Sequence, residues 1–445
     1  MKDTRTAFHY WESLNKSIMI TIICVVFILG YAAIALEHPI KINKAASALL
    51  TAAACWSVYA LMATDGHEAS EYLTGHLGEV SGILFFLMGA MTIVELIDAH
   101  DGFYIITSRI KTTNKRKLVW LIAFITFFLS AALDNLTTTI VIISLLRKII
   151  ADREDRLMFA ALVVIAANAG GAWSPIGDVT TTMLWIGGQI TAASIIIQTF
   201  IPSLVSMIIP AALISWRMKG NLKHADTMAG ENINFNTSSF KRNLVFGLGI
   251  GSLLFVPIFK TITHLPPYMG ILFGLGVMWV ITELIHSERD EQEKGLLSVN
   301  HALKKIDTPS VLFFLGILLS IGALQATGVL TDLATLMNEK IGNISIITIS
   351  IGLLSAVVDN VPLVAAAQGM YSLAEYPTGH FFWQFLAYCA GTGGSTLIIG
   401  SAAGVAAMGI EKIDFIWNLK KVTWLALIGY FAGAAVFMLQ YYLMA

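Results

Sequence analysis

Apolar and polar stretches alternate along the whole chain in a pattern typical of membrane spans. Apolar runs of about 20 residues, the length with which a helix crosses the hydrocarbon core of a bilayer, recur from end to end. The predicted apolar segments are 17–36, 45–63, 79–97, 157–190, 194–216, 243–260, 268–285, 309–327, 381–409 and 422–443. We therefore expect an all-α polytopic membrane protein.

Two further apolar stretches, 118–150 and 343–372, are interrupted near their middles by the same polar motif. The first contains LSAALDN at 129–135 and the second LSAVVDN at 354–360, which places Asp134 and Asp359 225 residues apart. A stretch of this length fits one long helix with a polar middle, or two short arms that meet at the motif.

Basic residues favour the second interpretation, because loops rich in Lys and Arg remain in the cytoplasm. Basic residues flank the first stretch on both sides: Arg109, Lys111, Lys115, Arg116 and Lys117 before it, and Arg147, Lys148, Arg153 and Arg156 after it. Both flanks are then cytoplasmic, and 118–150 is a re-entrant hairpin with Asp134 and Asn135 at its tip. The same reasoning places the acidic segment 64–77 outside, together with the N-terminus, despite Lys2, Arg5 and Lys16.

This topology predicts two repeats of one plan in opposite orientations, each with three spans, a re-entrant hairpin, a broken helix and a further span. Repeat 1 is 1–216 (hairpin 118–150, broken helix 157–190), 217–242 is a cytoplasmic linker, and repeat 2 is 243–445 (hairpin 343–372, broken helix 381–409). The broken helices share a glycine pattern, NAGGAWSPIG at 168–177 and GTGGSTLIIG at 391–400. Inverted repeats with interrupted helices are typical of secondary transporters, whose substrate site lies near the midplane where the breaks meet.

Composition supports a membrane protein and excludes several other classes. Charged residues make up 13% of the chain, against about 25% in soluble domains, and the mean hydropathy is +0.74. The net charge of −1 gives no indication of a nucleic-acid partner. Cys24, Cys55 and Cys389 are too far apart for a disulfide framework or metal motif. The first 16 residues show no secretory signal pattern.

The polar residues inside these apolar stretches are the candidate chemistry. An aspartate at the bilayer centre costs about 2.5–3.5 kcal/mol, so Asp134 and Asp359 indicate a functional site. The alternative is helix capping, which Asn provides without burying a charge. Capping or holding the hairpin tip is therefore the role we expect for Asn135 and Asn360, and direct ion contact by them remains open. Asp178, after the first glycine-rich break, is a third candidate, with an N-cap for a helix starting at 179 as its alternative.

Amide and hydroxyl oxygens surround these carboxylates in the sequence. Each could bind an ion or form an ordinary helix-packing hydrogen bond. The candidates are Asn168, Thr180, Thr181, Ser355, Ser395 and Thr396, and the candidate relays are Ser130 and Glu95, of which Glu95 could instead form a structural ion pair.

Oxygen ligands of this kind suit a hard alkali cation, and unwound backbone carbonyls add to them. A carboxylate also binds protons, and burial or a neighbouring carboxylate favours its protonated form. One aspartate can thus hold a proton or a sodium ion in competition, whereas three carboxylates repel an anion.

With Asp-Asn at both hairpin tips, the glycine-rich breaks and SPIGDVTTTM at 174–183, the chain resembles the NhaD-type sodium/proton antiporters of the ion transporter superfamily. The superfamily also contains arsenite permeases and dicarboxylate transporters, and the latter carry neutral Ser-Asn-Thr motifs at the tips.

The resemblance implies exchange of cytoplasmic Na⁺ or Li⁺ for external H⁺, in pH homeostasis and salt tolerance. It also implies an elevator-like movement, a homodimer in a bacterial cytoplasmic (inner) membrane and no cofactor. The ion-site residues that it implies are Asp134, Asn135, Asn168, Asp178, Thr180, Thr181, Ser355, Asp359, Asn360, Ser395 and Thr396, with Na⁺ at Asp134, Asp359 and Asp178.

Two alternatives remain open at this point. One is an oxyanion (arsenite) or dicarboxylate transporter of the same fold. The other is an intramembrane aspartyl protease, which also needs two aspartates that share a proton, although IGD at 176–178 is only a fragment of the protease pattern. We expect a transporter and no enzyme, with membrane lipid and small cations as its partners.

Overall fold

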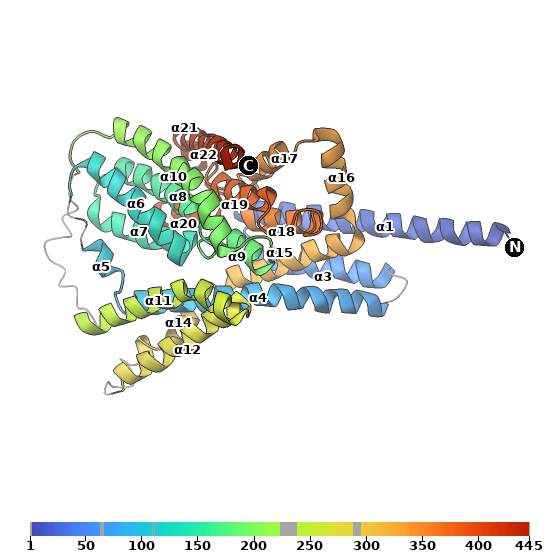
Figure 1. Ribbon diagram of the computed structural model, residues 1–445, viewed down its shortest axis with the longest axis horizontal. Coiled ribbons are helices and arrows are strands. Elements are labelled where there is room, and N and C mark those ends of the chain that lie inside the picture. Colours follow the sequence, from blue (N-terminus) through green and yellow to red (C-terminus); the bar gives the residue numbers. More distant parts are fainter. Residues whose placement is uncertain are drawn as a thin grey trace. The chain divides into compact units, whose positions relative to one another are not determined.

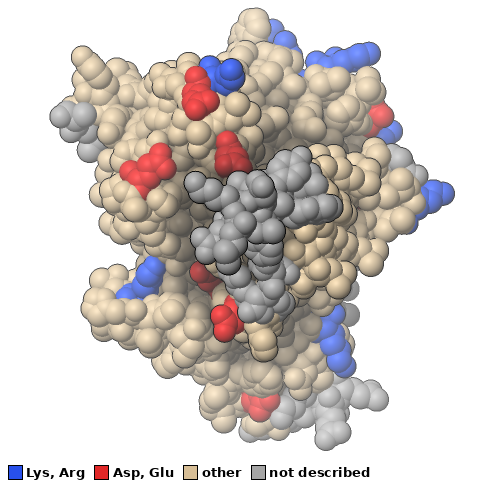
Figure 2. Space-filling model, turned by 90° about the vertical axis from the view of Figure 1, so that its right-hand side faces the viewer, with Lys and Arg blue, Asp and Glu red and all other residues tan. Residues whose placement is uncertain are grey.

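The chain forms helices where the apolar runs predict them (Figure 1). The computed structural model describes residues 2–62, 66–108, 110, 112–222, 238–287 and 295–444. In these ranges, nine helices are long and apolar enough to cross a membrane. One face of the molecule carries few charged side chains between large uncharged areas (Figure 2). The prediction of an all-α polytopic membrane protein is confirmed.

The first half of the chain contains α1 (Lys2–Ala35), α2 (Glu37–Ile40), α3 (Lys44–Met62), α4 (Gly66–Ala99), α5 (Tyr104–Thr107), α6 (Lys115–Leu133), α7 (Asn135–Ile149), α8 (Arg153–Gly171), α9 (Val179–Ile186) and α10 (Ala192–Arg217). The second half contains α11 (Ser239–Thr263), α12 (Pro267–Ile285), α14 (Val299–Lys305), α15 (Thr308–Thr327), α16 (Val329–Ile341), α17 (Ile344–Leu354), α18 (Asn360–Met370), α19 (Phe381–Gly393), α20 (Ala402–Glu411), α21 (Phe415–Lys421) and α22 (Thr423–Met444).

Each polar motif lies where one helix ends and the next begins. Asp134 separates α6 from α7, and residues 355–359 separate α17 from α18. Of the four helices that flank the two motifs, only α6 is long and apolar enough to span a membrane. The re-entrant hairpins, the sidedness of the loops and the inverted repeats therefore stay predictions. Residues 223–237 of the predicted linker, and the basic residues Arg109 and Lys111, lie outside the described residues.

The helices divide into two compact units. The first comprises Met1–Leu84, Asp307–Gly342 and Ala365–Glu375. Within it, α3 packs against α1 and α15. Trp56 on α3 donates its indole N–H to the carbonyl oxygen of Leu319 on α15, with an Nε1–O distance of 2.8 Å. This hydrogen bond adds a polar contact to the packing of α3 on α15.

The second unit comprises Phe85–Ile306, Asn343–Val364 and Tyr376–Ala445. Its core contains α8 and α19, in which every residue of 159–171 and of 381–393 is buried. A helix that is buried on all sides is mostly apolar, as these two sequences are apart from Asn168, Gln384 and Thr392. Helices α6, α7, α10 and α20 pack against α8, while α17 and α22 pack against α19.

Two glycines at matching places bring backbones together in this core. A Cβ on Gly170 of α8 would lie 2.9 Å from the carbonyl carbon of Phe127 on α6. A Cβ on Gly393 of α19 would lie 2.8 Å from the carbonyl carbon of Gly352 on α17. Each broken helix thus packs closely against the helix that leads into the neighbouring Asp-Asn motif.

Candidate functional site

Asp178 is the centre of a buried hydrogen-bond network. It follows the break after α8, is 1% exposed and caps α9, where its Oδ1 accepts hydrogen bonds from the backbone N–H and hydroxyl of Thr180 at 2.9 and 2.8 Å. Asn135 donates its amide N–H to Asp178 Oδ2 at 2.6 Å. Asn360 donates to the same oxygen at 3.2 Å. The asparagines of both repeated motifs therefore converge on one carboxylate.

The network continues from the first broken helix to the second through Asn168 on α8. Asn135 also donates to Asn168 Oδ1 at 3.0 Å. Asn168 in turn donates to the hydroxyl oxygens of Ser395 and Ser401, both at 2.9 Å. Asn168, Ser395 and Ser401 are all buried. Polar groups from both breaks and both motifs thus form one continuous set.

The two motif aspartates lie beside this network and are half-buried. Asp134 caps α7, accepting from the N–H and hydroxyl of Thr137 at 2.7 and 2.8 Å. Asp359 accepts from the N–H of Val361 at 3.3 Å. The charges of both aspartates act electrostatically on Asp178. All three carboxylates therefore belong to one electrostatic site.

For Asn135 we expected capping or holding of the tip. Asp134 caps α7, while Asn135 joins the tip to Asn168 and Asp178. An asparagine can both donate and accept, which lets it join a carboxylate to a second amide. Asp178 caps α9 as its alternative interpretation proposed. Its Oδ1 forms the cap, its Oδ2 accepts from both asparagines, and Asn360 also donates to Oδ1 at 3.3 Å.

The backbone of Asp134 is strained. Its φ of 113° and ψ of 160° fall in a region that is almost restricted to glycine. A non-glycine residue there costs about 1–3 kcal/mol, and such residues gather at functional sites. The retention of a carboxylate at this position favours a role beyond capping.

Ser130 and Ser355 hold the motif segments against the broken helices. Ser130 donates its hydroxyl to the carbonyl oxygen of Ala167 at 2.6 Å, and Ser355 donates to that of Ala390 at 2.9 Å. Thr181 donates to the carbonyl oxygen of Asp178 at 2.9 Å. These three hydroxyls position the site, and none of these bonds ends on a carboxylate.

Two other candidates differ in their relation to the network. The hydroxyl of Thr396 is buried and has no hydrogen-bond partner among the described residues. It is therefore available as an ion ligand. Glu95 forms an ion pair with Lys305 at 3.1 Å, which matches its structural interpretation, and no contact connects it to Asp178 among the residues that the structure describes.

The donor set suits an alkali cation. The described residues contain no group of three His, Cys, Asp or Glu side chains that could hold a metal ion. Carboxylate, amide and hydroxyl oxygens remain, and these hard ligands do not select a transition metal. Ser401 and Thr137 are members of the site that we did not predict. Ser401 occupies the position that corresponds to Asp178 in the alignment of the two breaks, so the sequence contained a signal for it.

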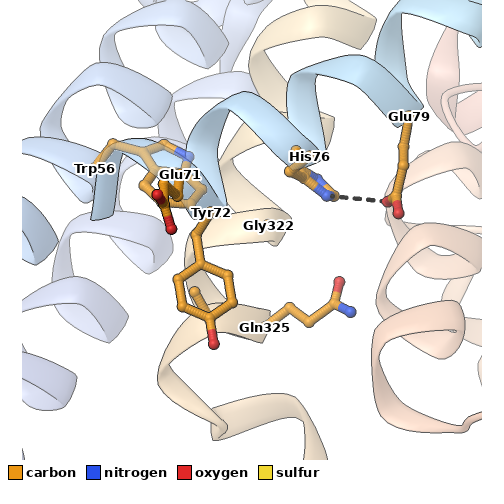
Figure 3. A pocket seen from close by; sticks show the side chains of 9 residues that line it. Trp56, Glu71, Tyr72, His76, Glu79, Gly322 and Gln325 are labelled. Atoms are coloured by element: carbon orange, nitrogen blue, oxygen red, sulfur yellow. Dashed lines mark ion pairs between the residues drawn. The ribbon is translucent and has the colours of Figure 1, made fainter. Parts of the chain in front are cut away.

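A separate pocket lies within the first unit. It has a volume of about 690 Å³ and is bordered by Trp56, Glu71, Tyr72, His76, Glu79 and Gln325, among others. Glu79 is turned toward His76 and forms an ion pair with it at 3.6 Å (Figure 3). None of the predicted ion ligands borders this pocket.

Comparison with known proteins identifies the family. Residues 31–391 match the citrate transporter (CitMHS) family. Sodium/proton antiporter 1 of Arabidopsis thaliana is 48% identical over 97% of this chain and 73% of its own length. Sodium/proton antiporter 2 of the same plant is 48% identical over 93% of this chain and 97% of its own length. The Na⁺/H⁺ antiporter NhaD of Alkalimonas amylolytica is 30% identical over 94% of this chain and 90% of its own length.

These similarities confirm several predictions. The protein is a multi-pass membrane transporter and not an enzyme, so the protease alternative is wrong. A transporter of this kind moves ions and needs no cofactor, as we expected. The chain therefore belongs to the citrate transporter (CitMHS) family, as a secondary transporter related to the NhaD-type sodium/proton antiporters.

Proposed function

We propose that this transporter exchanges cytoplasmic Na⁺ or Li⁺ for external H⁺ at Asp178, Asp134 and Asp359. The observation that carries the proposal is the convergence of Asn135 and Asn360 on the buried Asp178 carboxylate. Hydrogen bonds from N–H donors stabilise the charged form of a carboxylate, which is the form that binds a cation. The names of the relatives in Arabidopsis and Alkalimonas support the same exchange.

The chemistry of the exchange is competition for carboxylate oxygen. A deprotonated aspartate, with amide and hydroxyl oxygens beside it, binds a hard monovalent cation. Protonation removes the charge and turns an acceptor oxygen into a donor, so the cation leaves. Asp134 and Asp359 lie close enough to Asp178 to interact with it electrostatically, so a proton or cation on either of them affects Asp178.

The wider mechanism is part of the same proposal. We assign repeat 1 to residues 1–216 and repeat 2 to residues 243–445, with the motif hairpins and broken helices moving together as an elevator within a homodimer. Two pairs of equivalent contacts support the repeats: Ser130 and Ser355 on the broken helices, and Gly170 and Gly393 against the motif helices. For a bacterial chain the membrane would be the cytoplasmic one, and export of Na⁺ there would serve salt tolerance. The relatives named Na⁺/H⁺ antiporter support the exchange itself.

The first test uses purified protein in proteoliposomes with an inside-acid gradient and a pH-sensitive dye. Addition of Na⁺ or Li⁺ should dissipate the gradient with the native chain. Asp178→Asn, Asp134→Asn and Asp359→Asn should each reduce the rate by about tenfold or more, because the neutral amide cannot exchange a proton. Asparagine caps helices as well as aspartate does, so a capping role alone predicts native rates. Asp414→Asn, at the exposed cap of α21, is the matched control and should transport normally.

The family description raises citrate or another carboxylate as the competing substrate. The same vesicles answer this if citrate, a dicarboxylate and arsenite are added in place of the cations. Acceleration by one of these anions, with no response to Na⁺ or Li⁺, would disprove the cation proposal. A tricarboxylate would have to approach three carboxylates of like charge, which is why we favour the cation.

A further inference from the structure

Two histidines form a buried pair away from the Asp178 network. His100 directly follows α4 and His286 directly follows α12, and they are 0% and 1% exposed. Their Nε2 atoms lie 2.9 Å apart, a hydrogen-bond distance. The two residues are 186 positions apart in the chain, so the pair joins two helices that the sequence does not connect directly.

The contacts determine which ring nitrogens carry hydrogen. His100 Nδ1 lies 2.7 Å from the carbonyl oxygen of Leu96, which can only accept, so Nδ1 carries a hydrogen. A neutral imidazole has one N–H, so Nε2 of neutral His100 must accept. The hydrogen between the rings then belongs to His286 Nε2. In the neutral pair, two hydrogen bonds run in one direction: His286 donates to His100, and His100 donates to Leu96.

This geometry limits the number of protons that the pair can hold. One additional proton can enter at His286 Nδ1, and the bond to His100 then becomes a charge-assisted one. A second proton would place an N–H on both facing Nε2 atoms, 2.9 Å apart, with two positive rings in contact. That state requires the rings to separate. The closed pair therefore holds one additional proton at most.

Charged groups of both signs lie on the elements around the pair. Helix α11 packs against α12 and supplies two cations: Lys241 donates its ammonium to the carbonyl oxygen of Ile285, next to His286, and Arg242 lies 4.8 Å from the ring of Tyr104. The acidic groups of the surrounding elements are Glu95, which pairs with Lys305 of α14, the exposed Asp98 and half-buried Asp101 beside His100, and the exposed Glu283, which accepts from Trp279.

We propose that His100 and His286 are a buried proton-binding site that closes α4 against α12 and opens when acid supplies a second proton. Two imidazoles in an unfolded chain titrate near pH 6.5 and together hold two added protons in acid. The closed pair holds no more than one. The unfolded state then binds more protons, so the stability contributed by the pair is present above about pH 6.5 and is lost as the pH falls through that value.

Thermal unfolding of the full chain in detergent between about pH 8 and pH 5, on either side of the histidine titration, tests the proposal. As the pH falls, the stability of the native protein should decrease more steeply than that of His100→Gln/His286→Gln, whose amides form a neutral, non-titrating hydrogen bond. The difference in slope should correspond to at least one more proton bound on unfolding. His264→Asn, at the exposed end of α11, removes a histidine from a site that tolerates Asn and should leave the pH dependence native.

A single substitution keeps the proposal testable if the double variant does not fold. In His286→Gln, the side-chain oxygen of Gln can accept from a protonated His100, so the remaining ring can gain its proton without separation. Its stability should also depend less on pH than that of the native chain. Equal pH dependence in the native, single and double variants would overturn the proposal, whatever the result of the transport assay.

Discussion

Two single residues combine a carboxylate with an unfavourable environment: Asp134 with a strained backbone and Asp178 with burial. Asp134 occupies a backbone conformation suited to glycine. Asp178 is buried, and its carboxylate accepts hydrogen bonds from amide and hydroxyl donors. Both arrangements cost free energy that a purely structural residue would avoid. The cation site proposed above would account for both arrangements.

Asp134→Gly should therefore separate stability from transport. Glycine relieves a strain of about 1–3 kcal/mol and loses only a few tenths of a kcal/mol as a cap. We expect a higher melting temperature with transport abolished. Asp414→Gly is the control, because the backbone of Asp414 is unstrained at φ −72° and only the cap is weakened. A less stable Asp134→Gly would show that its carboxylate contributes more to folding than the strain costs.

At the scale of helices, close backbone approach holds the broken helices beside the motif helices. Gly170 and Gly393 occupy corresponding positions and face α6 and α17 respectively. A side chain at either position would meet backbone atoms, which cannot move aside as a flexible side chain can. The packing of α8 and α19 therefore requires glycine at these two places.

Gly393→Ala should destabilise the protein by about 1–3 kcal/mol, the usual cost of overpacking a core. Gly409→Ala is a matched substitution, since Gly409 lies within α20 and a Cβ added there would meet no described atom within 4 Å. There alanine should stabilise the helix by up to about 1 kcal/mol. Chemical or thermal denaturation of the two variants measures both effects, and equal changes would refute the packing explanation.

The sequence predicted the helix breaks well, because the motifs and glycine pairs are repeated. It did not identify Asp178 as the centre of the site, since convergence of Asn135, Asn168 and Asn360 depends on how separate helices pack. It also missed α16, whose polar residues resemble a loop between two apolar runs. Asn and Asp have similar capping preferences, so their division of roles at 134–135 could not be read from residue type.

At the scale of the whole second unit, buried charge joins segments that are distant in the chain. Glu411 at the end of α20 has a side chain only 1% exposed and forms ion pairs with Arg156 of α8 at 2.7 Å and Arg147 of α7 at 3.5 Å. The sequence separation of Arg156 and Glu411 is 255 residues. The pairs thus connect the two halves of the chain beside the broken helices.

Glu411→Ala should destabilise the protein by about 3–5 kcal/mol, because it leaves a partly buried arginine without its partner. The effect should change little between low and high salt, since buried pairs are weakly screened. Glu283→Ala removes an exposed glutamate and should change stability by less than about 0.5 kcal/mol. Strong salt dependence of the Glu411 effect would indicate a solvated surface pair instead.

The meeting of Asn135 and Asn360 on one carboxylate has a kinetic consequence. If both motifs contact the same aspartate, they form one binding site, and an ion cannot bind at one motif independently of the other. The transport rate should then rise hyperbolically with Na⁺ concentration, with a Hill coefficient of one. Two sites with positively linked occupancy would give a sigmoidal curve, so a Hill coefficient above one would rule out the single shared site.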